Sequence, residues 1–94
     1  MRVTVHLPGL LQADAEGAAH IPVEVGDDTP LGGVLDALAA RYPGLDRRLR
    51  DERGELRRYV NVFVDGDECR GAGGLAAPVT DGANVRVLPS VAGG

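Results

Sequence analysis

Tyr59-Val60-Asn61-Val62-Phe63-Val64-Asp65-Gly66 is the stretch with the clearest strand pattern in the chain. Its three valines share one face of the predicted strand, and Tyr59, Asn61 and Phe63 share the other. Asp65-Gly66 favours a two-residue hairpin turn, because such a turn needs a positive φ at both positions. We therefore expect a hairpin with a short return strand over Asp67-Glu68-Cys69-Arg70.

Two shorter alternating segments near the N-terminus predict a second hairpin. Residues 2–7 alternate between aliphatic and polar side chains, and residues 20–25 repeat this pattern. Pro22 has no N–H to donate to a ladder, so we expect it on the open side of an edge strand. The mixed segment between the two strands, residues 10–19, is expected to be a loop.

The segment between the two hairpins predicts one amphipathic helix. Thr29 is expected to be its N-cap, Pro30 its first residue, and Pro43-Gly44 its end. Gly32 and Gly33 are poor helix formers, and we interpret them as allowing close packing against the sheet. Apolar residues recur at spacings of three and four along this segment, namely Leu31, Val34, Leu35, Leu38 and Tyr42.

The remaining segments complete an α+β pattern. Residues 45–58 carry charges of mixed sign and predict a solvated connector, with one short helical turn at Leu45-Leu49. The last strand should point Val85 and Val87 into the core and Arg86 to the other side. The element order predicts a mixed sheet of four to five strands with one main helix packed across it.

Composition restricts the classes of function. The length of 94 residues fits one domain, and the net charge of −4 argues against a nucleic-acid binder, which would need a basic face. No run of about 18 apolar residues is present to span a membrane. All ten basic residues are arginine, so the chain has no side-chain amine. The single cysteine, Cys69, excludes an intramolecular disulfide and a cysteine-rich metal site, and it indicates a cytoplasmic protein.

The side chains do not form a recognisable catalytic centre. His6 and His20 fall on two strands that we pair, and they could approach each other or Glu24 on the predicted outer face. Surface histidines are usually inert, and we expect Cys69 to be a half-buried strand residue rather than a nucleophile. The Gly71-Ala72-Gly73-Gly74 segment lacks the Lys and Ser/Thr of a phosphate-binding loop. We therefore expect no enzyme activity, no metal site and no bound cofactor.

The chain ends with Leu88-Pro89-Ser90-Val91-Ala92-Gly93-Gly94, directly after the last predicted strand. We divide it into a folded domain, residues 1–88, and a flexible extended tail, residues 89–94, which spans about 20 Å when fully extended. The final glycines lack a Cβ, so another protein's backbone can approach them closely. The α-carboxylate of Gly94 is the only ionised group in this segment. Chain ends rich in small residues are also common without any function.

Three exposed hydrophobic side chains are expected beside the base of this tail. Tyr59 and Phe63 lie on the outer face of the best-defined strand, and Leu88 faces the same way on the last strand. Aromatic residues gathered on a sheet face often mark a partner site. The alternative is that a loop covers them as a second small core. We favour docking, because these residues lie close to the tail.

Several further segments share a pattern with one protein family, namely Thr29-Pro30-Leu31-Gly32, Arg41-Tyr42-Pro43-Gly44-Leu45, the Tyr59 to Asp65 strand, Gly73-Gly74-Leu75 and Asp81-Gly82-Ala83-Asn84-Val85. Together with the tail they resemble the ubiquitin-like sulfur carrier proteins of the ThiS/MoaD superfamily, which have the β-grasp fold. The resemblance covers essentially the whole chain, and it is closest to the CysO-type carriers of cysteine biosynthesis in actinobacteria. Cys69 stands where those proteins have an aliphatic residue.

The resemblance implies a carrier rather than an enzyme. An ATP-dependent, E1-like adenylating and sulfurtransferase enzyme would adenylate Gly94, and a sulfur donor would then replace AMP to leave a thiocarboxylate. The ATP belongs to that partner, so the carrier holds no cofactor. The implied acceptor is a PLP-dependent cysteine synthase, with a metalloprotease releasing the product. The residues that would thread into the narrow nucleotide site of the activating partner are Pro89, Ser90, Val91, Ala92 and Gly93.

Other functions remain open at this point. The same tail would serve sulfur donation to a molybdopterin, thiamine or specialised-metabolite pathway. A ubiquitin-like modifier would instead be attached to other proteins through Gly94, and would accumulate as an isopeptide rather than a thiocarboxylate. A plain interaction module would keep its activity when Gly93 and Gly94 are deleted.

Overall fold

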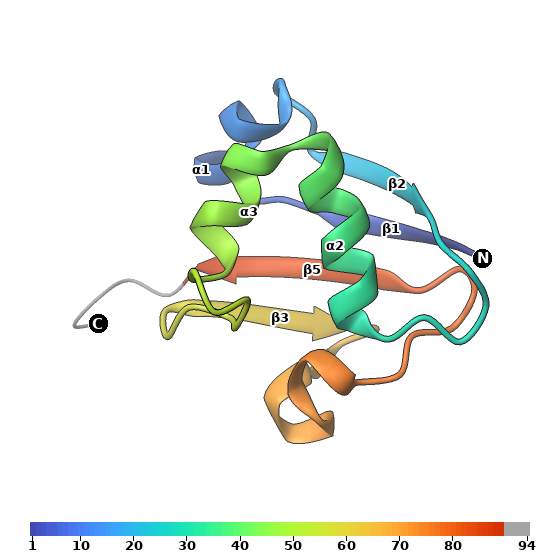
Figure 1. Ribbon diagram of the computed structural model, residues 1–94. Coiled ribbons are helices and arrows are strands. Elements are labelled where there is room, and N and C mark those ends of the chain that lie inside the picture. The colour runs from blue at the N-terminus through green and yellow to red at the C-terminus, as the bar shows by residue number, and fades with distance from the viewer. Residues whose placement is uncertain (90–94) are drawn as a thin grey trace.

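Five strands form one mixed sheet in the computed structural model, which describes residues 1–89 (Figure 1). They are β1 (Arg2–His6), β2 (His20–Glu24), β3 (Val60–Val64), β4 (Asp67–Glu68) and β5 (Asn84–Pro89). The strand order across the sheet is β2-β1-β5-β3-β4. β1 and β5 pair in parallel at the centre, and all other neighbours are antiparallel.

β2 forms one edge of the sheet, as the position of Pro22 predicts. The Leu7 N–H donates to the Ala19 carbonyl at 2.9 Å, so odd-numbered residues of the first hairpin carry the ladder bonds. Pro22 pairs with Thr4 between these bonds, which leaves its nitrogen on the open side. The Pro22 carbonyl accepts a hydrogen bond from Arg41 at 2.9 Å.

Two helices, α2 (Leu31–Arg41) and α3 (Pro43–Leu49), cover one face of the sheet (Figure 1). Burying their aliphatic side chains against those of the strands stabilises the fold by about 25 cal/mol per Å² of apolar surface. This arrangement confirms the predicted β-grasp class. The fully buried side chains at this interface include Leu31, Val34, Leu35, Leu38, Leu45 and Leu49 from the helices and Val3, Val5, Val62, Val85 and Val87 from the strands.

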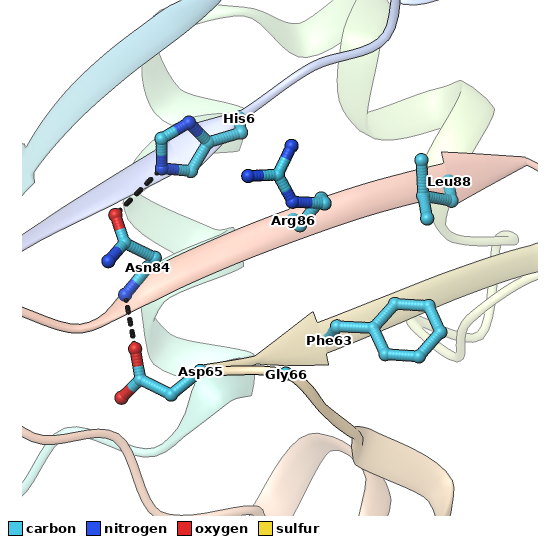
Figure 2. A pocket seen from close by; sticks show the side chains of 7 residues that line it. All are labelled: His6, Phe63, Asp65, Gly66, Asn84, Arg86 and Leu88. Carbon is cyan, nitrogen blue, oxygen red and sulfur yellow. Dashed lines mark hydrogen bonds between the residues drawn. The ribbon is translucent and has the colours of Figure 1, made fainter.

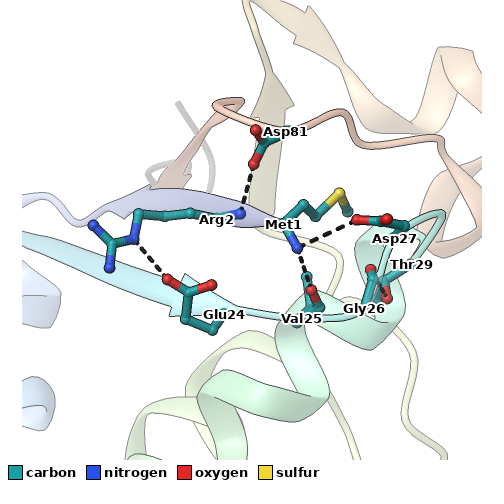
Figure 3. Close-up of polar contacts among 8 residues, drawn as sticks. All are labelled: Met1, Arg2, Glu24, Val25, Gly26, Asp27, Thr29 and Asp81. Carbon is teal, nitrogen blue, oxygen red and sulfur yellow. Dashed lines mark hydrogen bonds and ion pairs between the residues drawn. The ribbon is translucent and has the colours of Figure 1, made fainter.

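Polar contacts around Met1 and Arg2 close the end of the sheet opposite Pro89 (Figure 3). The Met1 amino group donates to the Val25 carbonyl at 2.6 Å. The Arg2 N–H donates to Oδ1 of Asp81 at 2.8 Å, in the turn before β5. The Arg2 guanidinium pairs with Glu24 at 2.7 Å on the outer face. These contacts tie β1 to both β2 and the turn that leads into β5.

The start of α2 differs from the prediction. Pro30 precedes the first helical residue, Leu31, and has an extended backbone with ψ of 172°. The Thr29 hydroxyl donates to the Gly26 carbonyl at 2.6 Å and caps no helical N–H, so the N-cap prediction is wrong. The physical reason is that the Leu31 N–H is satisfied by the carbonyl of Ala77 at 3.0 Å, from a distant loop.

Two segments expected to be irregular are partly helical. The connection between β1 and β2 contains α1 (Gly9–Gln12) and a 3-10 helix, η1 (Ala13–Ala15), where we expected a loop. Leu11 and Ala15 are buried, and this burial holds the segment on the core. The charged connector begins with α3, which is longer than the single turn predicted and buries two leucines in the core.

The glycine-rich region also packs differently from the prediction. A Cβ on Gly32 would lie 3.2 Å from the carbonyl oxygen of Leu75 in the 3-10 helix η3 (Gly74–Ala76), so its close approach is to this helix and not to the sheet. A Cβ on Gly33 would meet the Thr29 side chain. The return strand β4 is only two residues long, because the backbone turns into the 3-10 helix η2 (Cys69–Ala72).

Candidate functional site

The base of the tail is the end of a central strand. β5 lies between β1 and β3, and its last residue, Pro89, pairs with Val60. Pro89, which we assigned to the tail, is thus part of the sheet. The other predicted tail residues lie outside the described part of the chain, and their roles stay predictions; they are Ser90, Val91, Ala92, Gly93 and Gly94.

An open groove of about 660 Å³ lies over the uncovered face of β5 (Figure 2). Arg86 is central in it, because its register partners are His6 on β1 and Phe63 on β3. Leu88 lies two residues further along the same strand. The groove therefore combines apolar surface with one guanidinium. Its lining residues are His6, Phe63, Asp65, Gly66, Asn84, Arg86 and Leu88.

The polar groups of the groove are paired except for Arg86. Asp65 accepts a hydrogen bond from the Asn84 N–H at 2.9 Å, and Asn84 Oδ1 lies 2.8 Å from His6 Nε2 (Figure 2). Asp65 and Gly66 have φ of 49° and 91°, as the predicted hairpin turn requires. Within residues 1–89 no carboxylate or carbonyl pairs with the Arg86 guanidinium. Arg86 is therefore the charged group that a partner can engage.

The three predicted docking residues fall into two adjoining patches. Phe63 is half-buried and Leu88 is 41% exposed, and both line the groove. Tyr59 is 50% exposed but lines a separate hollow. Tyr59 directly precedes Val60, the register partner of Pro89, so the two patches adjoin the base of the tail.

The hollow beside Tyr59 is basic, which we did not foresee from the sequence. Arg53 in this hollow is paired with Asp51 and Glu55, whereas Arg58 has no partner within residues 1–89. The mixed signs of residues 45–58 had indicated only a solvated connector, because the neighbouring charges cancel along the chain. The arginines that line the hollow are Arg53, Arg57, Arg58 and Arg70.

Cys69 is a core residue and a poor nucleophile. Its side chain is fully buried in η2, not half-buried in a strand as predicted. Burial raises the pKa of the Cys69 thiol, and the nearby Glu68 carboxylate raises it further. Cys69 lines a separate hollow with Ala72 and Ala77, whereas His6 lines the groove over β5. The structure therefore does not bring a thiol and an imidazole together.

Residues 1–89 contain neither a candidate membrane span nor a larger metal-binding cluster. No helix in this part of the chain is long and apolar enough to cross a membrane. No three side chains of the His, Cys, Asp and Glu types gather there as a metal-binding group.

The ThiS family model matches residues 10–94, which include the last strand and the tail. The chain belongs to the ThiS family. The sulfur carrier protein CysO of Mycobacterium tuberculosis is 42% identical over 96 residues, which cover 100% of both proteins. The small archaeal modifier protein 3 of Haloferax volcanii is 42% identical over 78 residues, 83% of this chain and 84% of that protein.

A solved structure of the same kind confirms the fold. A chain in the BexX/CysO complex of Amycolatopsis orientalis superposes with a TM-score of 0.87 at 34% identity, covering 98% of this chain and 99% of that one. The resemblance to the ubiquitin-like sulfur carriers is thus confirmed. Proteins of this family are small carriers rather than enzymes, so this chain is a CysO-like carrier protein.

Proposed function

We propose that this ThiS-family protein carries sulfur as a thiocarboxylate on Gly94 and donates it to cysteine biosynthesis. The observation that carries the proposal is the full-length identity of 42% to a CysO sulfur carrier. The base of the tail supports this proposal, because Pro89 ends the central strand β5, which is bonded on both sides.

The proposed chemistry takes place in two steps on a partner enzyme. A carboxylate is a poor electrophile, so an E1-like enzyme first joins Gly94 to AMP from ATP and releases pyrophosphate. A sulfide-level sulfur nucleophile then attacks the acyl carbon. The new carbon–sulfur bond replaces the bond to AMP, which leaves with the electron pair. The products are AMP and a Gly94 thiocarboxylate, whose sulfur is a good nucleophile. We place this chemistry in the cytoplasm.

We propose that the groove over β5 docks the activating enzyme. Its exposed Leu88 and half-buried Phe63 supply apolar contact. Arg86, which has no ion pair within residues 1–89, supplies a charge for a partner carboxylate. Tyr59 and the neighbouring arginines extend this surface past Pro89. Glycine at positions 93 and 94 would let the chain pass through a narrow nucleotide site without a steric clash. Ser90, Val91 and Ala92 would span the distance between groove and site.

Intact mass spectrometry tests the carrier proposal directly. Incubation with the activating enzyme, ATP and a sulfur source should raise the mass by the difference between sulfur and oxygen, on Gly94. Gly93→Val should abolish this mass increase without unfolding the domain. A variant with one extra residue after Gly94 should also show no mass increase and remain folded. Ala92→Gly is the matched control and should retain the change. An unchanged mass with a demonstrably active enzyme would refute the proposal.

A binding measurement tests the docking surface separately. Leu88→Ala and Arg86→Ala should each weaken binding to the activating enzyme by about tenfold or more, as interface anchors do. Leu10→Ala is the matched control, because Leu10 is 70% exposed and does not line the groove. Equal affinities for all three variants would place the docking surface elsewhere.

The thiocarboxylate sulfur needs an acceptor enzyme. We propose a PLP-dependent cysteine synthase, followed by a metalloprotease that releases the product from the carrier. Co-purification of the thiocarboxylate form with such a synthase supports this choice. If the carrier instead forms a complex with a molybdopterin synthase large subunit or a thiazole synthase, its sulfur goes to molybdopterin or thiamine biosynthesis.

A protein modifier is the second candidate, favoured by the 42% identity to a small archaeal modifier protein. The chemistry is the same up to the adenylate, and the outcomes then differ. A modifier accumulates as an isopeptide between Gly94 and a lysine of another protein, whereas a carrier accumulates as the thiocarboxylate. Mass spectrometry of cell extracts distinguishes the two products.

A further inference from the structure

Two histidine rings meet on neighbouring strands at the open face of the sheet. His6 on β1 lies directly opposite His20 on β2, and their Nδ1 atoms are 2.8 Å apart. This is a non-hydrogen-bonded pair of the ladder, the kind that brings side chains closest. The rings meet edge to face, with centroids 4.9 Å apart and planes at 75°.

Asn84 of β5 decides which nitrogen of His6 carries a proton. Its Oδ1 lies 2.8 Å from His6 Nε2 (Figure 2), and an amide oxygen can only accept a hydrogen bond. His6 Nε2 is therefore protonated, and in the neutral ring Nδ1 presents its lone pair toward His20. A single proton, on His20 Nδ1, then joins the two rings.

A divalent transition-metal ion can take the place of that proton. If the proton of His20 moves to Nε2, both Nδ1 lone pairs become available, and the neutral pair binds a metal without losing a proton. Metal–nitrogen bonds of about 2.0–2.1 Å place two ligands about 2.9 Å apart at a right angle and about 3.3 Å apart at a tetrahedral angle. The observed separation of 2.8 Å lies close to the right-angle value. Each ring must still rotate, because its lone pair has to turn from the other nitrogen toward a shared ion.

We propose that His6 and His20 form a two-imidazole binding site for Ni²⁺, Cu²⁺ or Zn²⁺, with Asn84 orienting His6. Imidazole is a preferred ligand of these ions, and metal-binding histidines usually donate their other N–H to an oxygen acceptor. Residues 1–89 supply no third side chain of a metal-binding group. Water therefore completes the coordination, and the ion exchanges freely. The site does not depend on the proposed sulfur chemistry.

Charged side chains near the two histidines indicate how substitutions should change the affinity for a metal ion. Arg86 is the register partner of His6 on β5 and has no ion pair within residues 1–89, so its charge opposes a bound cation. The Arg2 and Glu24 pair lies on the same face of the same ladder. Like His6 and His20, Arg2 and Glu24 lie directly opposite each other in this ladder, but they carry no imidazole. They therefore provide a matched control.

Calorimetric titration of the untagged full chain with NiCl₂, and separately with ZnCl₂, tests the site. The wild type should bind one ion. His6→Gln and His20→Gln should each weaken binding by about tenfold or more, because each removes one of the two imidazole ligands. The double variant should show no measurable binding, because no imidazole remains. Asn84→Ala should weaken binding by about tenfold through the orientation of His6. Arg86→Gln should tighten it.

The control variants are Arg2→Gln and Glu24→Gln, which should leave the affinity unchanged. A two-dimensional amide spectrum of each variant shows whether the domain remains folded, and the imidazole resonances show which rings shift when Zn²⁺ is added. Shifts confined to His6 and His20 support the site. The proposal is overturned if no saturable binding occurs, if either histidine substitution leaves the affinity unchanged, or if the two substitutions remove two independent weak sites.

Discussion

The two faces of β5 differ sharply although they belong to one six-residue strand. Val85 and Val87 are fully buried beneath the helices. Arg86 and Leu88 alternate with them and face the open groove, where Leu88 is 41% exposed and Arg86 is unpaired within residues 1–89. One strand thus stabilises the domain with one face and offers a binding surface with the other.

The difference shows how this small domain separates stability from recognition. The side chains on the helix-covered face contact one another in a single aliphatic cluster, so their identities are constrained by packing. Those on the open face contact mainly solvent and each other, so they can be chosen for a partner or a ligand. Substitutions on the helix-covered face of β5 should therefore lower stability, whereas those on the open face should mainly change binding.

The largest effect on stability is expected from Val87→Ala. The substitution removes two buried carbon atoms and leaves a cavity, so the free energy of unfolding should fall by about 2–3 kcal/mol. Leu88→Ala, one residue further, should cost less than about 1 kcal/mol because that side chain is partly exposed. Urea unfolding followed by circular dichroism measures both values.

Equal losses of unfolding free energy in the two variants would show that the two faces of β5 contribute equally to stability. An unchanged urea dependence, the m-value, is needed in both variants, because it shows that each variant unfolds from the same compact state. A large loss for Leu88→Ala would mean that the open face also contributes to the core.

The alternation of each strand could be predicted from the sequence, and with it the division between the two faces. The strand residues that face the core are those that the period of two indicated. Local periodicity carries no information about which strand lies next to which, so the parallel pairing of β1 with β5 was not predictable from it. That pairing places His6 beside Asn84 and Arg86, and it creates most of the groove.

The remaining errors have the same origin in long-range contacts. Thr29 has the residue type of an N-cap, but the first N–H of α2 bonds to the distant Ala77 carbonyl. Leu11 and Ala15 lie in a segment without periodicity, and they are held by burial against the core rather than by a local signal. We expected Cys69 in a strand because it follows the predicted hairpin turn, but the chain turns into η2 there.

A smaller effect is expected from Arg50, which joins the two covering helices. Its side chain is 10% exposed, and it donates to Asp46 of α3 and Asp36 of α2, each at 2.8 Å. Arg50→Met keeps much of the apolar stem but loses these charge-assisted hydrogen bonds, so we expect a loss of about 1–2 kcal/mol. Chemical unfolding at low and at high salt measures the loss and its screening.

Arg53→Met is the matched control for this prediction. Arg53 also contacts two carboxylates, those of Asp51 and Glu55, but its side chain is 75% exposed. Exposed pairs contribute little, so the loss should stay within about 0.5 kcal/mol. Equal losses for the two arginines would show that burial does not set the strength of these pairs.

The smallest effect concerns Asp51, on the exposed loop after α3. Its Oδ1 accepts hydrogen bonds from the Glu55 N–H at 3.2 Å and the Arg53 N–H at 2.9 Å. The pKa of Asp51 is lowered, first by the Glu55 hydrogen bond and then by those of Arg53, which outweigh the opposing effect of desolvation. The folded state therefore holds this proton more weakly than the unfolded chain does.

The sign of the pH dependence follows from this lowered pKa. The contribution of Asp51 is complete above the ordinary carboxyl pKa of about 3.9 and is lost as the pH falls through the lower pKa of the folded state. The difference in unfolding free energy between wild type and Asp51→Asn should therefore be larger at neutral pH than in acid, and it should narrow below about pH 4. Urea unfolding across this range measures that difference, and a gap that stays constant with pH would show that the carboxylate charge does not stabilise the loop.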